Sequence, residues 1–119
     1  HLLNLYPNKP IAVVESEKTA IIASIFFPNF IWMATGGISN LTYDKIKALK
    51  GRGIVLFPDL GAYNLWFDKA KYFKSMFNIT VSDYLEKNAT AQDKEQKYDL
   101  ADYLLSLDKN RFFGIDDTT

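Results

Sequence analysis

The sequence contains no cysteine and a single histidine among 119 residues. The lack of cysteine excludes disulfide bonds, thiol catalysis and cysteine-based zinc sites in this segment, and it is compatible with a reducing cytoplasm. Net charge is also lacking, because 14 Lys and Arg balance 14 Asp and Glu. No overall field therefore draws the chain to nucleic acid or anionic lipid. Contact with nucleic acid then depends on local patches, on metal ions or on another part of a longer protein.

Long apolar runs are missing as well. The apolar stretches are too short to cross a bilayer and no signal-peptide pattern opens the chain, so we expect a cytoplasmic protein without a membrane partner. The first residue is His1, for which we see no catalytic role. Because it is not Met, we expect either a fragment of a longer polypeptide with other domains or a chain that carries an added tag. A core is available, since 48% of the residues are hydrophobic and 15% aromatic. We expect one domain at residues 11–107, after a lead-in at 1–10 and before a tail at 108–119.

Three continuous apolar runs predict strands at residues 11–14, 30–34 and 54–57. Runs that are continuous rather than alternating are typical of strands covered on both faces of a parallel sheet. Each run is followed by a segment with helical spacing, and alternating strands and helices are the signature of βαβ units. The predicted fold class is α/β, with three α/β/α layers around a mainly parallel sheet of about four strands.

The other expected elements follow from capping and periodicity. Helices are predicted at residues 17–26, 43–50, 62–77 and 99–107. Ser16 is a natural N-cap of the first helix, whose many apolar residues leave little polar surface, so this helix should be well buried. A fourth strand is predicted at residues 78–85, and the polar stretch 86–97 is interpreted as a flexible loop or arm.

Two acidic residues follow predicted strands, Glu15 after the first and Asp59 after the third. Ligands of open parallel sheets bind beyond the carboxyl ends of the strands, so both side chains are expected there. If the first and third strands are neighbours, the two carboxylates approach and repel, and one takes up a proton or a divalent cation sits between them. Oxygen ligands of this kind suit Mg²⁺.

Further candidates surround this pair. Gly36 and Gly37 follow the second strand and let backbone N–H groups approach a phosphate, and Lys18 in the first helical turn is positioned to meet one. Structural interpretations stay open beside these: Asp59 as a helix N-cap, the glycine pair as a tight turn, and Lys18 as a solvated side chain.

Taken in order, four segments resemble the Toprim family. Residues 11–20 look like its first motif, an apolar strand that ends in Glu and turns into a helix, and the Glu-Lys-Thr-Ala form at 17–20 is similar to primases and primase-helicases of phages, plasmids and mobilisable elements. Residues 34–37 match the glycine-containing turn after the second strand. Residues 53–59 match the third strand and the first Asp of the Asp-x-Asp motif. Residues 97–104 are similar to the Lys-x-Asp-x-x-Asp-Tyr-Leu segment that often closes such domains.

This resemblance implies Mg²⁺-dependent (or Mn²⁺-dependent) phosphoryl or nucleotidyl transfer on nucleic acid. It points to a DNA primase or a related replication protein of a mobile element, with DNA and nucleotides as ligands. It assigns general acid/base work to Glu15 and metal binding to Glu15, Asp59 and Asp99. Lys18, Gly36 and Gly37 are the implied contacts to phosphate.

One position departs from the family pattern, because the second Asp of Asp-x-Asp falls at Gly61. Asp99 or Asp102 supplies a carboxylate in its place, or both only cap the last helix. The departure keeps open a catalytically degenerate module that binds nucleic acid or a partner. A phospho-receiver domain, which also carries acids after its first and third strands, is disfavoured because the sequence offers no clear fifth strand ending in Lys.

Overall fold

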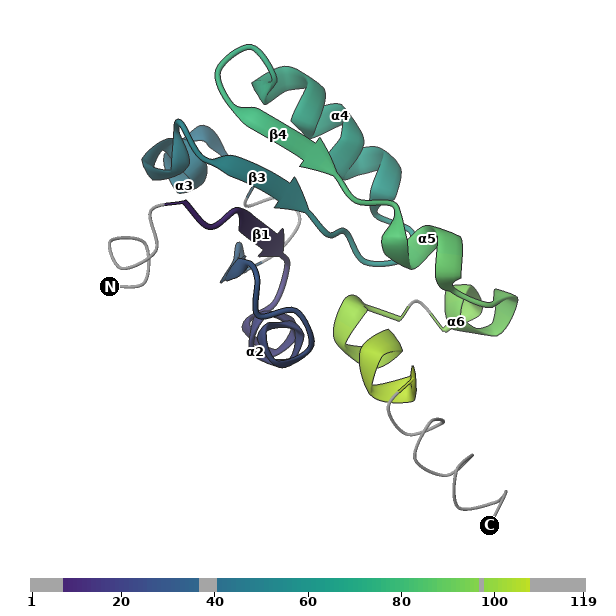
Figure 1. Ribbon diagram of the computed structural model, residues 1–119. Coiled ribbons are helices and arrows are strands. Elements are labelled where there is room, and N and C mark those ends of the chain that lie inside the picture. The colour runs from purple at the N-terminus through teal and green to yellow at the C-terminus, as the bar shows by residue number, and fades with distance from the viewer. Residues whose placement is uncertain (1–7, 37–40, 97, 108–119) are drawn as a thin grey trace.

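The computed structural model describes residues 8–36, 41–96 and 98–107. Strands and helices alternate along the chain, as Figure 1 shows. In order, the elements are β1 (Ile11–Val14), α2 (Glu17–Phe26), β2 (Ile31–Ala34), α3 (Tyr43–Ile46), the short 3-10 helix η2 (Lys47–Leu49), β3 (Gly53–Leu56), α4 (Tyr63–Phe73), β4 (Asn78–Val81), α5 (Tyr84–Asn88), α6 (Ala91–Glu95) and a last helix at residues 100–107.

The four strands form one sheet in the order β2-β1-β3-β4, and every pair is parallel. The first strand lies in the centre, with Val13 opposite Met33 of β2 on one side and Leu56 of β3 on the other. The predicted α/β class and parallel sheet are therefore confirmed. Strands β1, β2 and β3 lie within one residue of the predicted runs, because each is a short apolar segment bounded by turn residues.

Helices cover both faces of the sheet. One face packs against α3, η2 and α4, and the other against α2, α5 and the last helix. Within β1 the side chains alternate between these two layers: Ile11 and Val13 join the first, while Val14 joins the second. All four residues of β1 are buried, which explains the continuous apolar run in the sequence.

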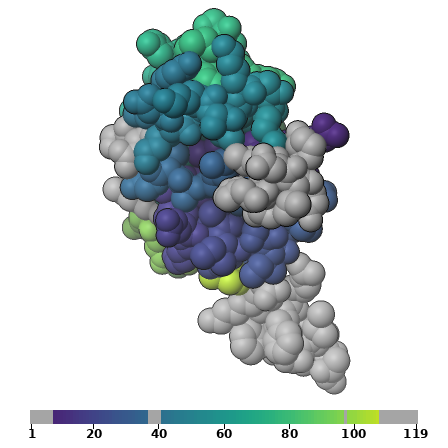
Figure 2. Space-filling model, turned by 90° about the vertical axis from the view of Figure 1, so that its left-hand side faces the viewer, coloured from purple at the N-terminus to yellow at the C-terminus, as the bar shows by residue number. Residues whose placement is uncertain are grey.

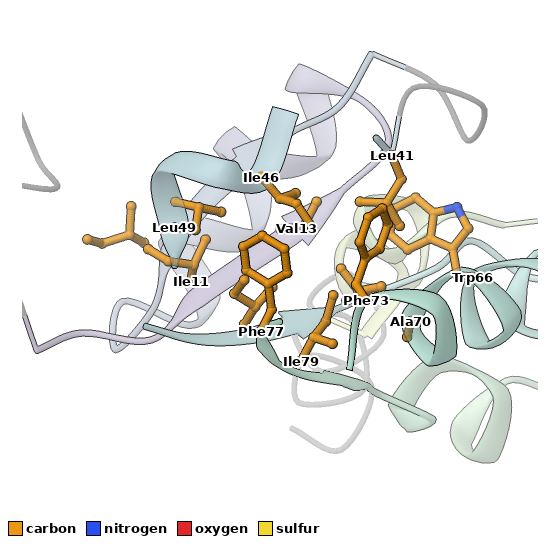
Figure 3. Close-up of a cluster of buried hydrophobic side chains, with 13 residues drawn as sticks. Ile11, Val13, Leu41, Ile46, Leu49, Trp66, Ala70, Phe73, Phe77 and Ile79 are labelled. Carbon is orange, nitrogen blue, oxygen red and sulfur yellow. The ribbon is translucent and has the colours of Figure 1, made fainter. Parts of the chain in front are cut away.

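The first layer contains the larger core. Trp66 of α4 is fully buried, and Phe73 lies between it and Phe77 in the same core (Figure 3). The same core also contains three side chains from the α3–η2 region, Leu41, Ile46 and Leu49. Figure 2, which looks from the left of Figure 1, shows the chain of α2 at the bottom and that of α4 and β4 at the top, with the α3 segment between them.

The prediction that α2 is well buried is wrong. Thr19 and Ala23 are buried against the sheet, but Ile21 and Ile25 on the outer side are 66% and 74% exposed. Only one side of α2 meets the sheet, and no described element covers the other. The apolar composition alone could not distinguish the two sides.

The carboxyl-terminal third also differs from expectation. The predicted fourth strand ends early, at Val81, and the predicted loop at 86–97 contains most of α5 and all of α6. In α5, Leu85 is buried in the second core, so this turn of helix is stabilised by tertiary packing. In α6, Thr90 and Asp93 form a capping box. None of the helices within the described residues has the length and apolarity that a membrane crossing requires.

Candidate functional site

Two carboxyl groups lie at the carboxyl edge of the sheet on neighbouring strands. Glu15 directly follows β1, and Asp59 lies three residues beyond the end of β3. These strands pair side by side, and the Phe57 N–H extends the pairing by donating to the Val13 carbonyl at 2.9 Å. The parallel arrangement therefore brings Glu15 and Asp59 together, as the sequence predicted from a 2-1-3 strand order.

The turn after β1 is fixed by local hydrogen bonds. The Ser16 hydroxyl accepts the Thr19 N–H at 3.1 Å and lies 2.8 Å from the Thr19 hydroxyl. This confirms Ser16 as the N-cap of α2 and ends the strand just before it. Glu15 is consequently held half-buried at the last position before the helix.

The Asp59 carboxyl is electrostatically unfavourable in its ionised form. Burial raises its pKa to about 8, and a hydrogen bond with the Glu15 side chain and the negative charges of Glu15, Asp99 and Asp102 contribute to the increase. Its Oδ1 atom is buried and has no hydrogen-bond partner among the described residues. An acid in this environment holds a proton near neutral pH, and a bound cation satisfies the same negative charge.

The segment before the last helix joins this edge of the sheet. The Leu60 N–H donates to the Tyr98 carbonyl at 3.2 Å, which places residues 98–99 beside the loop that carries Asp59. Asp99 and Asp102 then cap the last helix reciprocally: the Asp102 N–H donates to Asp99 Oδ1 at 2.8 Å, and the Asp99 N–H donates to Asp102 Oδ2 at 3.2 Å. Both residues therefore act as helix caps while their charges reach Asp59.

Lys18 faces these two carboxylates. Its Nζ atom lies 3.8 Å from Asp99 Oδ2 and 3.7 Å from Asp102 Oδ1, and its side chain is 60% exposed. Each aspartate thus uses one oxygen for the helix cap and the other for Lys18. Lys18, which the sequence predicts as a phosphate contact, lies at the rim of the acidic site and joins the first βα unit to the last helix.

The backbone N–H of Gly36, which the sequence predicts as a phosphate contact, is engaged within the fold. The Gly36 N–H donates to the Glu15 carbonyl at 2.8 Å, and Gly36 has a φ of 85°, a left-handed conformation that glycine adopts readily. Gly36 thereby positions the backbone of Glu15, and a phosphate would have to compete for its N–H. Gly37 lies outside the described residues.

Gly61 stands where the Toprim motif has its second aspartate, and the backbone conformation at this position favours glycine. Gly61 has a φ of 89°, which disfavours residues with a Cβ atom, although the space around it is open. Oε1 of Glu86, from α5, lies 3.5 Å from the Gly61 nitrogen. Sequence reasoning missed Glu86 because it lies in the stretch interpreted as a loop; the Thr90–Asp93 capping pattern is the signal in the sequence that indicates helix in this stretch.

The carboxylates at this edge of the sheet form an open donor set for a divalent ion. Among the described residues, no group of three or more His, Cys, Asp or Glu side chains is arranged to hold a metal ion. Mg²⁺ commonly binds through one or two carboxylates and keeps waters or substrate phosphates as its other ligands. The adjacent Glu15 and Asp59 carboxylates, with the unpartnered Asp59 Oδ1, fit this open type of site and do not form a closed cage.

A family model described as Domain of unknown function (DUF6371) matches residues 1–60, half of the 119-residue chain. The chain belongs to this family. The DUF6371 match includes β1 to β3 and carries Glu15, Lys18, Gly36 and Asp59, whereas Asp99 and Asp102 lie beyond it. No curated protein and no solved structure matches the chain.

Proposed function

We propose that this DUF6371 chain is a Toprim-like domain of a DNA primase or related mobile-element replication protein, which binds Mg²⁺ and acts on the phosphates of DNA. The observation that carries the proposal is the pairing of Glu15 with Asp59 at the carboxyl ends of β1 and β3, with the Asp59 oxygen left unpartnered. The parallel 2-1-3-4 sheet is consistent with a Toprim-like fold.

The two carboxylates have different roles in this proposal. Asp59 is the metal ligand, because its pKa of about 8 and its buried Oδ1 both reflect negative charge that lacks a counter-charge. Glu15, at the strand end beside it, would share the metal and also take or return the proton of the attacking or leaving oxygen. A bound Mg²⁺ would offset the charge that develops on the transferred phosphoryl group.

Asp99 and Lys18 complete the site. Asp99 Oδ1 is engaged in capping, so Oδ2, which now contacts Lys18, would be the oxygen available to a cation. Lys18, which is 60% exposed at the rim, would then contact a DNA phosphate. The two contacts are alternatives within one local charge network.

The proposal is tested by titrating the full chain with Mn²⁺ and measuring the free ion by electron paramagnetic resonance. We expect one site whose affinity falls by about tenfold or more in Glu15→Gln and in Asp59→Asn, equal to a loss of about 1.4 kcal/mol or more. Glu17→Gln is the matched control, since Glu17 is exposed in the first turn of α2. Equal Mn²⁺ affinity in all four proteins contradicts the metal site.

Gly61 favours a second candidate, a degenerate module that positions nucleic acid or a partner without catalysis. The left-handed backbone at Gly61 supports it, and so does the finding that no three His, Cys, Asp or Glu side chains among the described residues are arranged to hold a metal ion. Primer synthesis or strand nicking by the intact protein, abolished by Glu15→Gln, excludes this candidate. Nucleic-acid binding that is unchanged by Glu15→Gln, without either activity, supports it.

A further inference from the structure

A hollow lined by charged, amide and aromatic side chains lies next to the acidic site. Its volume is about 570 Å³, within the size range of about 300–1,000 Å³ that is usual for small-molecule sites. It is formed by the loop after β3, the first turn of α4, and the helices α5 and α6. Its lining residues are Gly61, Tyr63, Asn64, Asp83, Glu86 and Lys94.

Gly61 connects this hollow to the carboxylate pair. It lies two residues after Asp59 and also lines the hollow, and a Cβ atom at this position would meet nothing within 4 Å. A ligand in the hollow therefore lies beside the backbone that carries Asp59. One end of such a ligand is within reach of the chemistry proposed for Glu15 and Asp59.

The hollow carries hydrogen-bonding groups beside an aromatic pair. The Tyr63 ring stacks on Phe67 with a centroid separation of 5.9 Å and an angle of 24°, and the Lys71 ammonium lies 5.3 Å from the Phe67 ring centre. Asn64 supplies an amide, which both donates and accepts. Flat apolar faces beside groups that donate and accept hydrogen bonds are the combination that recognises nucleobases.

Glu86 is the carboxylate best placed to select a ligand. Asp83 is engaged by Lys87 at 3.1 Å, whereas Glu86 forms no ion pair within the described residues and has only a long 3.5 Å contact to the Gly61 N–H. A carboxylate offers two acceptors and no donor. Because Lys87 pairs with Asp83, Glu86 is the carboxylate of the hollow that is open to a ligand, and it favours one that presents N–H donors.

We propose that this hollow binds the base of a guanine nucleotide, with Glu86 accepting from the ring N–H and the neighbouring amino group. Guanine is the base whose pairing edge offers two adjacent donors, which match the two oxygens of one carboxylate. Adenine and cytosine place an acceptor nitrogen beside their single amino group, and uracil flanks its N–H with carbonyls, so each of them repels one carboxylate oxygen.

The remaining groups fit the same ligand. The base stacks on Tyr63, Asn64 meets its other edge, and the Lys94 ammonium, which also lines the hollow, meets the sugar hydroxyls. This inference rests on the proposed function, because it assigns the guanine base to the hollow and its phosphates to the Glu15–Asp59 end. It adds a substrate class and a specificity residue that the strand-end carboxylates alone do not indicate.

The test is a nuclear magnetic resonance titration of the full chain with guanosine monophosphate and, separately, uridine monophosphate, in the presence of a metal chelator. We expect the Gly61 backbone amide and the Asn64 side-chain amide to shift with guanosine monophosphate, and its affinity to exceed that of the uridine compound by about tenfold, since two hydrogen bonds distinguish them. Glu86→Gln removes this preference. Glu95→Gln, at an exposed position on α6, is the matched control and retains it.

Equal affinity for the two nucleotides, shifts confined to other surfaces, or an unchanged preference in Glu86→Gln overturns the inference. Its failure is separable from failure of the proposed function, because the titration excludes metal. If Mn²⁺ does not bind at Glu15 and Asp59 while the guanine-dependent shifts remain, the base site stands and the metal proposal is wrong. If Mn²⁺ binds there and no base preference is seen, the metal proposal stands and the base site is wrong.

Discussion

The carboxyl group of Asp59 lies against that of Glu15, and the hydrogen bond between them needs a proton on one of the two. The contact arises because β1 and β3 are adjacent and parallel, so the residues that follow them meet at one edge of the sheet. Burial and three neighbouring carboxylates, including Glu15, keep the proton on Asp59 up to a pH of about 8.

This proton makes the stability of the fold depend on pH. The pKa of Asp59 rises from its ordinary value of 3.8 to about 8 in the folded chain, so between these values the folded state binds a proton that the unfolded state has lost. The contribution of Asp59 is therefore most favourable below about pH 4 and is lost as the pH rises toward 8. Asp59→Asn, which mimics the protonated acid, should become more stable than the wild type as the pH increases over this window.

Urea unfolding of both proteins from pH 5 to pH 9, in the presence of a metal chelator, measures the difference. Asp44→Asn provides the control, because Asp44 lies exposed on α3. A difference between Asp59→Asn and wild type that stays constant across the window contradicts the buried, protonated carboxyl.

The reciprocal cap of the last helix predicts a cost that depends on hydrogen bonding rather than charge. Asp99→Ala removes the acceptor of the Asp102 N–H and should lower the free energy of unfolding by about 1 kcal/mol. Asp99→Asn keeps an acceptor oxygen and should lose much less. Chemical denaturation of the two variants checks this; equal losses would mean that the charge, and not the cap, is what stabilises the helix.

Gly61 and Gly53 differ in backbone conformation, so alanine substitutions at these two positions form a matched pair. Gly61→Ala should destabilise the fold by about 1–2 kcal/mol, because the φ of 89° at this position disfavours a Cβ atom. Gly53→Ala in β3 should be nearly neutral, since its added Cβ would meet Asn78 and Pro10 at ordinary contact distances of 3.8 and 4.0 Å. Thermal unfolding of both variants measures the contrast. A stable Gly61→Ala variant would mean that the loop adopts another conformation.

Lys18 should contribute little to stability and more to DNA binding. Its ion pairs are long and its side chain is 60% exposed, so Lys18→Ala should change the free energy of unfolding by less than about 1 kcal/mol. If it contacts one phosphate, the slope of log affinity for DNA against log salt should fall by about 1. Lys71→Ala on α4 serves as control, and an unchanged slope for Lys18→Ala identifies a purely structural lysine.

The sheet and its central strands could be predicted because their signals are local. A four-residue apolar run such as β1, followed by the Ser16 cap, has few other interpretations. The α5 and α6 segments could not be predicted from periodicity because each is only five residues long. Leu85 holds α5 in place through the second core, and that contact depends on residues far away in the chain.

In the candidate site, the residues at the strand ends could be predicted from the sequence, whereas the contacts between distant segments could not. Glu15 and Asp59 follow from the strand ends and the strand order, which an α/β pattern limits strongly. The contacts of Lys18 with Asp99 and Asp102 join residues more than 80 positions apart, and no local pattern encodes them. The closeness of Glu86 to Gly61 depends on how α5 packs and was equally inaccessible.

A divalent cation held by Glu15 and Asp59 should be visible in nuclear magnetic resonance spectra of the full chain, through the broadening of amide signals that Mn²⁺ causes. We expect the strongest broadening at Glu15, Ser16, Asp59 and Leu60, weaker broadening at the amino ends of the strands such as Gly53 and Asn78, and loss of this pattern in Glu15→Gln. Broadening centred on exposed carboxylates such as Asp44 or Asp68, or a pattern that Glu15→Gln leaves unchanged, excludes a cation at this pair.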